Sequence, residues 1–102
     1  ERFERRAERS AERRAEMVRN FASEQGLSQE TEASLTMAMQ QEHEQIMQLF
    51  RDAREDGSWR AARTASETVR SDTDEQLGEV LDEEQLEAWQ QLREEENPRR
   101  RR

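Results

Sequence analysis

The chain has 102 residues, of which 30% are apolar and 41% are charged, and its formal net charge is −8 at pH 7. So short a chain with so few apolar residues can form only one small domain, and its three Gly and one Pro favour long helices over turn-rich sheets. The absence of Cys excludes a disulfide framework, a thiol nucleophile and a thiolate zinc site. We therefore expect a single all-α domain over residues 1–97, and a homodimer that buries two shallow apolar faces against each other.

Apolar residues recur at helical spacing in the first half of the chain and predict two helices, over residues 1–24 and 28–56. Gly26 is expected to end the first helix, because Gly readily adopts the left-handed conformation of a C-cap. Ser28 is expected to cap the second. The apolar stripe of the second helix consists of Leu35, Met39, His43, Ile46, Phe50 and Ala53. A disordered chain would have no reason to maintain such spacing.

Gly57 interrupts the pattern, and Ser58 is the predicted cap of a third helix over residues 58–81. This helix repeats apolar or small residues in steps of three and four, at Trp59, Ala62, Ser66, Val69, Thr73, Leu77 and Val80. Such a repeat is typical of a coiled-coil seam. A two-residue connection leaves the second and third helices little choice but to fold back on each other. We therefore expect a long antiparallel helical hairpin at the centre of a four-helix fold.

The fourth predicted helix, over residues 82–96, begins with a reciprocal capping box. Asp82 can accept a hydrogen bond from the backbone of Gln85, while the Gln85 side chain reaches back to the backbone of Asp82. Leu81 and Leu86 flank this box as a hydrophobic staple. The helix stops before Pro98, because the residue preceding Pro disfavours helical geometry. Residues 98–102, a basic tail, are expected to be disordered.

Two helix starts carry a family resemblance. Leu27-Ser28-Gln29-Glu30-Thr31 and Leu81-Asp82-Glu83-Glu84-Gln85 resemble the paired LTxxQ motifs of the Spy/CpxP family of periplasmic helical proteins. The resemblance extends over about residues 15–93 and includes helix order and motif spacing. It is incomplete, since Ser28 and Asp82 replace the capping Thr and Thr31 replaces the first Gln.

The resemblance implies a dimer with a cradle-shaped surface that binds unfolding clients without ATP or takes part in envelope-stress sensing. It also implies a periplasmic or other extracytoplasmic location. The chain opens on Glu1 without a signal-peptide pattern, so we expect that a targeting segment or membrane anchor can precede it. Related CnrX-type and ZraP-type proteins sense or bind heavy metals through His, acidic or Met ligands, which is the alternative function.

The chain has more large aromatic residues and Met than one hairpin seam can bury. Such side chains are suited to contact with varied apolar partners. The predicted surface for clients, or for a sensor or regulator protein, comprises Phe21, Met37, Met47, Phe50, Trp59 and Trp89. The alternative is that these residues form the dimer interface or dock the first and fourth helices onto the hairpin.

The single His of the chain, His43, lies four residues from both Met39 and Met47. Residues four apart share a helix face, so these three side chains are the candidate ligands of a transition metal. The alternative is that Met39 and His43 simply pack in the seam. Because the metal sensors of this family carry further His residues that the chain lacks, we expect no cofactor.

An enzyme and a nucleic-acid-binding protein are both disfavoured. One His, no Cys, no Gly-rich phosphate loop and no HExxH string leave no recognisable catalytic constellation. Residues 27–97 hold six Arg against nineteen acidic residues, which opposes phosphate binding. We expect a non-enzymatic chaperone or stress sensor of the Spy/CpxP type. A heavy-metal sensor and a coiled-coil scaffold with one dedicated partner are the alternatives.

Overall fold

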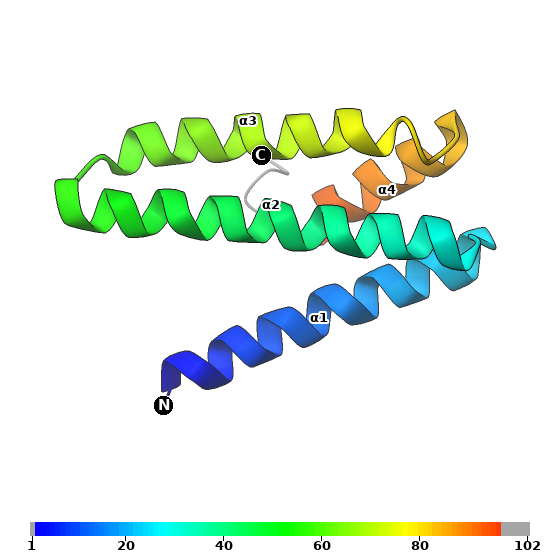
Figure 1. Cartoon of the computed structure of the whole chain (residues 1–102), viewed down its shortest axis with the longest axis horizontal. Coiled ribbons are helices and arrows are strands. Elements are labelled where there is room, and N and C mark those ends of the chain that lie inside the picture. The colour runs from blue at the N-terminus through cyan, green and yellow to red at the C-terminus, as the bar shows by residue number, and fades with distance from the viewer. Residues whose placement is uncertain (1, 97–102) are drawn as a thin grey trace.

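The computed structural model describes residues 2–96, which form four helices without a strand (Figure 1). They are α1 (Arg2–Gln25), α2 (Gln29–Asp56), α3 (Trp59–Leu77) and α4 (Glu83–Glu96). The predicted all-α class is therefore confirmed. The basic tail at 98–102 lies outside the described residues.

Local capping chemistry sets most helix ends where the sequence predicted them. The backbone N–H of Thr31 donates to Ser28 Oγ at 3.1 Å, so Ser28 caps α2. Gly26 and Gly57 have φ of 64° and 76°, the left-handed region in which Gly carries no steric cost. At the start of α4 both hydrogen bonds of the predicted capping box are present. Gln85 N donates to Asp82 Oδ1 at 2.8 Å, and Asp82 N donates to Gln85 Oε1 at 3.1 Å.

Both ends of the third helix differ from the prediction. The Ser58 side chain does not cap α3, because its hydroxyl and its backbone N–H both donate to Asp56 Oδ1. These bonds hold the pKa of the Asp56 carboxyl below its ordinary value. The helix ends at Leu77 rather than at residue 81, since Gly78 supports a helix poorly and the next residues turn. That turn returns Leu81 to the core, where it is 5% exposed.

Helices α2 and α3 form the predicted antiparallel hairpin (Figure 1). Small residues line much of its seam and let the two backbones approach closely; Ala53, Ala62, Ser66 and Thr73 are all buried. Ser66 and Thr73 satisfy their hydroxyls by donating to backbone carbonyls of their own helix, at 2.8 and 3.0 Å. A seam of this kind buries little apolar area, so most hydrophobic stabilisation has to come from elsewhere.

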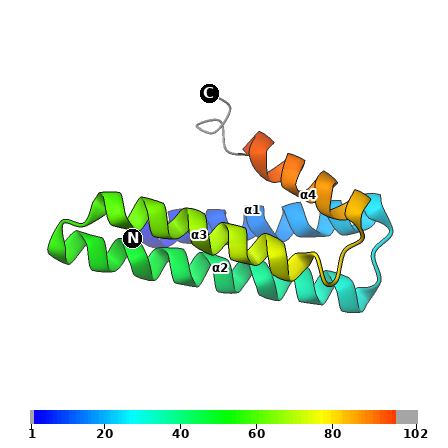
Figure 2. The ribbon, with the colours of Figure 1, turned by 90° about the horizontal axis from the view of Figure 1, so that it is seen from above.

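The main core lies at the end of the hairpin opposite Gly57, where α1 and α4 meet α2 and α3. It consists of Val18, Phe21, Leu35, Met39, Leu77, Leu81 and Trp89. In Figure 2, α4 lies to one side of this end of the hairpin and does not reach the Gly57 turn. In Figure 1, α1 runs beside α2 and diverges from it toward the N-terminus. The half of the hairpin near Gly57 is consequently left without a covering α4.

Candidate functional site

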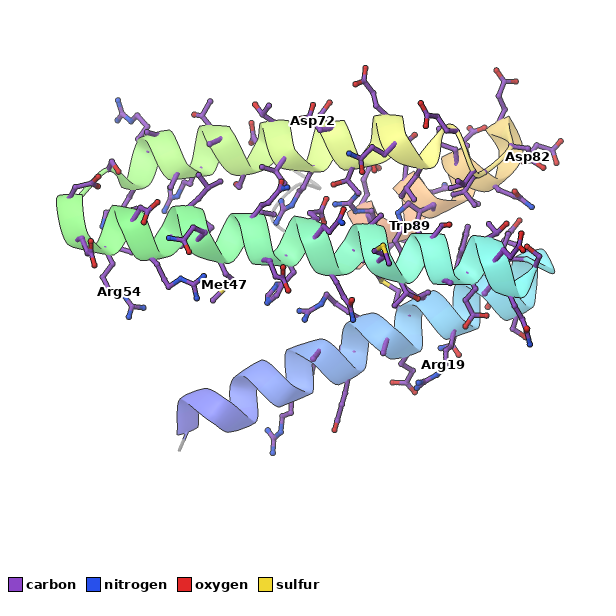
Figure 3. The ribbon with its side chains drawn as sticks, viewed as in Figure 1. Arg19, Met47, Arg54, Asp72, Asp82 and Trp89 are labelled. Carbon is purple, nitrogen blue, oxygen red and sulfur yellow. The ribbon has the colours of Figure 1, made fainter. Side chains whose placement is uncertain are left out.

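The uncovered end of the hairpin carries an aromatic pair. The Gly57 turn brings Trp59, the first residue of α3, beside the last turns of α2, where its ring lies 6.1 Å from that of Phe50 at an interplanar angle of 32°. Trp59 remains 46% exposed. Met47 precedes Phe50 by three residues, a spacing that places both on one helix face, and it is 43% exposed. Figure 3 shows that its side chain leaves α2 on the side away from α3. We call Met47, Phe50 and Trp59 the tip patch.

A shallow groove follows the hairpin seam closer to its middle. It is lined mainly by apolar atoms, and its residues are Gln45, Gln48, Leu49, Ala65, Thr68 and Val69. Leu49 and Val69 are half-buried there. The groove is open along its length, which suits contact with an extended or helical segment better than enclosure of a small molecule.

The tip patch contains three of the six predicted surface residues, of which Phe50 and Trp59 are in contact, and two others prove to be core. Phe21 and Trp89 are only 3% and 0% exposed, and their rings meet edge to face with centroids 5.0 Å apart. Their assignment to an exposed surface was wrong, and the alternative, that they dock the first and fourth helices, is correct. Aromatic side chains bury the largest apolar area per residue, which is the physical reason for Phe21 and Trp89 to lie in the main core. Met37 is 61% exposed but lies ten residues before Met47, about 15 Å along α2.

The predicted metal ligands are not assembled into a site. Met39 is 6% exposed within the core, whereas Met47 belongs to the tip patch. His43 Nδ1 lies 3.2 Å from Arg14 Nη1 of α1, and because a guanidinium can only donate, that ring nitrogen accepts. Burial, and then the Arg14 charge, lower the pKa of His43 against the opposing effect of Glu44 and Glu42. Among the described residues, no three His, Asp or Glu side chains converge to hold a metal ion.

A buried charge cluster joins α4 to the hairpin, and sequence reasoning missed it. Arg93 Nη2 donates to Glu42 Oε1 at 2.6 Å, and Arg93 Nη1 donates to Asp74 Oδ1 at 2.7 Å. The Arg93 and Glu42 side chains are 15% and 7% exposed, and that of Asp74 is 28% exposed. One arginine of α4 thereby bridges α2 and α3 directly beyond Trp89.

Two signals in the sequence point to this cluster. The spacing Leu35, Met39, Glu42, Ile46 is as regular as the stripe through His43, so Glu42 occupies a seam position. Arg93 is also the single cation between residues 83 and 96, among six glutamates. In this chain that lone cation is the residue of α4 that pairs with acidic residues of the hairpin.

No protein-family model, curated protein or solved structure matches the chain. The LTxxQ-like segments act here as helix caps, a role that their local hydrogen bonds fully explain. In the part of the chain that the structure describes, no helix is both long and apolar enough to span a bilayer. The tip patch and the groove are therefore the features from which a function has to be argued.

Proposed function

We propose that this protein is a non-enzymatic helical binding protein that holds apolar segments of other proteins on the tip patch and along the hairpin groove. It works without ATP, as a chaperone or stress sensor of the Spy/CpxP type, in an extracytoplasmic compartment. The observation that carries the proposal is the placement of Trp59, whose ring lies 6.1 Å from that of Phe50 yet leaves 46% of its surface in water. The compartment rests on the resemblance of the two helix starts alone.

The composition of the surface supports binding of varied clients. Met and aromatic side chains adapt to different apolar partners without demanding a fixed pattern of hydrogen bonds. The Gln45 amide in the groove lining can both donate and accept, so it tolerates a polar backbone passing over it. Gln48 and Thr68 already bond within their own helices, to Asp52 and Arg51 and to the Thr64 carbonyl. A shallow, open groove provides modest affinity, which favours exchange of clients over permanent capture.

A homodimer is part of the proposal. A hairpin whose middle seam holds mostly small side chains leaves Leu49 and Val69 only half-buried. A second copy would enlarge the continuous apolar surface beyond what one tip patch offers. Sedimentation equilibrium tests this part separately, with a dimer mass expected at micromolar concentration and a monomer mass refuting it.

The decisive experiment follows light scattering by an unrelated, chemically denatured enzyme after dilution. The wild-type chain is expected to suppress scattering at near-stoichiometric amounts. The double variant Phe50→Ser/Trp59→Ser is expected to lose most of this effect, because it removes the aromatic pair. Met37→Ser is the matched control, since it removes a 61% exposed apolar side chain outside the patch.

Circular dichroism shows first that each variant has kept its helix content. Absence of suppression by folded wild-type protein contradicts the proposal. So does an equal loss in Met37→Ser and in the double variant, because the effect would then depend on total exposed apolar area rather than on the tip patch. Tight binding of one dedicated partner without suppression would support the coiled-coil scaffold instead.

A further inference from the structure

The first helix is attached to the hairpin unevenly along its length. Its C-terminal half is anchored in the main core, where Val18, Phe21 and Ala22 are buried. Toward the N-terminus α1 diverges from α2 (Figure 1), and Ala11 and Ala15 are exposed although they continue the apolar stripe of Val18 at helical spacing. The described side chains from residue 11 to residue 16 therefore bury little apolar surface against α2.

One polar contact joins this half of α1 to α2. Arg14 Nη1 donates to His43 Nδ1 at 3.2 Å, and among the described residues this is the only side-chain hydrogen bond between α1 and another helix. Both side chains are half-buried. No described carboxylate forms an ion pair with Arg14, whereas Arg93 binds two. The attachment therefore depends on the lone pair of a neutral imidazole.

That lone pair is lost when His43 takes up a proton. A protonated imidazole donates from both ring nitrogens, and a guanidinium has no acceptor to offer it. Two cationic donors would then face each other across the former hydrogen bond. The contact between Arg14 and His43 is therefore compatible with a neutral imidazole and incompatible with an imidazolium.

The other charges around His43 do not remove this conflict. On its own helix Glu44 and Glu42 favour the imidazolium, but burial and then the guanidinium of α1 outweigh them and lower the pKa of His43. Glu42 is already bound by Arg93 of α4, which also binds Asp74 of α3. Glu44 is exposed, so the high dielectric constant of water weakens its attraction.

Arg14 also lines an apolar crevice between α1 and α2. The other residues of the crevice are Ala11, Ala15, Val18, Thr36, Met39 and Gln40. Met39 belongs to the main core and is 6% exposed. Because Arg14 both lines the crevice and joins its two walls, loss of the contact with His43 allows the walls to separate.

We propose that the contact between Arg14 and His43 is a pH-sensitive device, in which protonation of His43 releases the N-terminal half of α1 from α2 and opens the apolar crevice. The C-terminal half of α1 stays in the core. The contact is intact while His43 is neutral, and because the pKa of His43 is lowered in the fold, release occurs as pH falls below the ordinary value of 6.5. No residue of the tip patch takes part, so the device goes beyond the proposed client surface.

Distances between spin labels measure the opening. The chain has no Cys, so Arg9→Cys/Gln41→Cys places one label on α1 and one on α2, both at exposed positions. Arg9 precedes Val18 by nine residues, about 13 Å of helix, so a swing of about 20° moves it by about 5 Å. A distance increase of about this size is expected between pH 8 and pH 5. Its midpoint should coincide with the titration of the His43 imidazole signal in NMR spectra, which is unambiguous because the chain has one His.

Substitutions at the contact separate this device from general acid effects. Arg14→Gln and His43→Gln should each keep the short distance at both pH values, because an amide can pair with either form of its partner. His43→Arg should show the long distance already at pH 8, since its charge is permanent. Arg13→Gln is the matched control; it removes an exposed neighbouring charge and should open as the wild type does.

A second label pair monitors the hairpin itself. Gln41→Cys/Glu67→Cys places labels at exposed positions of α2 and α3, and their distance should not change with pH. An unchanged distance between Arg9→Cys and Gln41→Cys while His43 titrates overturns the proposal, as does opening of Arg14→Gln to the wild-type extent. Lengthening of both label pairs together, or unfolding of the hairpin before His43 titrates, equally overturns it, because the transition would then be global.

Discussion

Replacing Arg93 by Met is expected to destabilise the fold by about 3 kcal/mol. Removing one partner of a fully buried ion pair costs about 3–5 kcal/mol, because the other charge stays buried without compensation. The lower end applies here, since Arg93 is 15% exposed and water reaches the cluster, while Glu42 at 7% exposed is the charge left behind. Asp74 is 28% exposed, so Asp74→Asn should cost no more than about 1 kcal/mol.

Urea unfolding followed by circular dichroism measures both variants. A domain of this size loses roughly 4–8 °C of Tm per kcal/mol, so in a thermal scan Arg93→Met should melt about 12–24 °C below wild type. The double variant Glu42→Leu/Arg93→Met should recover most of the loss, because two apolar side chains of similar length need no compensation. A loss below about 0.5 kcal/mol in Arg93→Met, or a double variant no more stable than it, refutes the view of Glu42 as a buried charge that depends on Arg93.

Three further predictions concern separate parts of the fold. Trp89→Ala should cost about 3–5 kcal/mol in urea unfolding, because it empties the centre of the core; a cost below about 1 kcal/mol would contradict the burial found here. Asp82→Ala should cost about 1 kcal/mol by removing the acceptor of the α4 cap, and Asp82→Ser, which keeps an acceptor, should recover most of it. The pKa of His43 is lowered in the fold, so folding favours the neutral imidazole. The folded protein therefore keeps its full stability above the ordinary pKa of 6.5. It loses stability as pH falls through and below that value, because the unfolded chain then binds the proton more readily. Urea unfolding at pH 8 and pH 5 should therefore show a smaller acid destabilisation in His43→Gln than in wild type, and an equal acid destabilisation would contradict this account.

The fold and its helix caps could be predicted because their causes are local. Ser28 and Asp82 bond to backbone groups three residues away, and Gly57 adopts a conformation that depends on its own missing Cβ. Each such interaction is written into a short stretch of chain. The same principle explains the error at Ser58, where a nearby competitor, Asp56, takes the hydroxyl instead of the helix end.

The sequence by itself determined that the chain is helical, where most helices begin and end, and that two of them form a hairpin. The tertiary structure alone decided which aromatic residues are buried and which acidic residue faces a cation. Phe21, Trp59 and Trp89 have similar helical surroundings in sequence, but Phe21 and Trp89 lie in the core where four helices meet, whereas Trp59 contacts only the neighbouring helix of the hairpin through Phe50 and stays 46% exposed. Glu42 and Arg93 are 51 residues apart, so their pairing follows from how α4 crosses the hairpin. The spacing of apolar residues shows which face of a helix is buried. Which residues pack against that face depends on the angles at which helices distant along the chain cross each other.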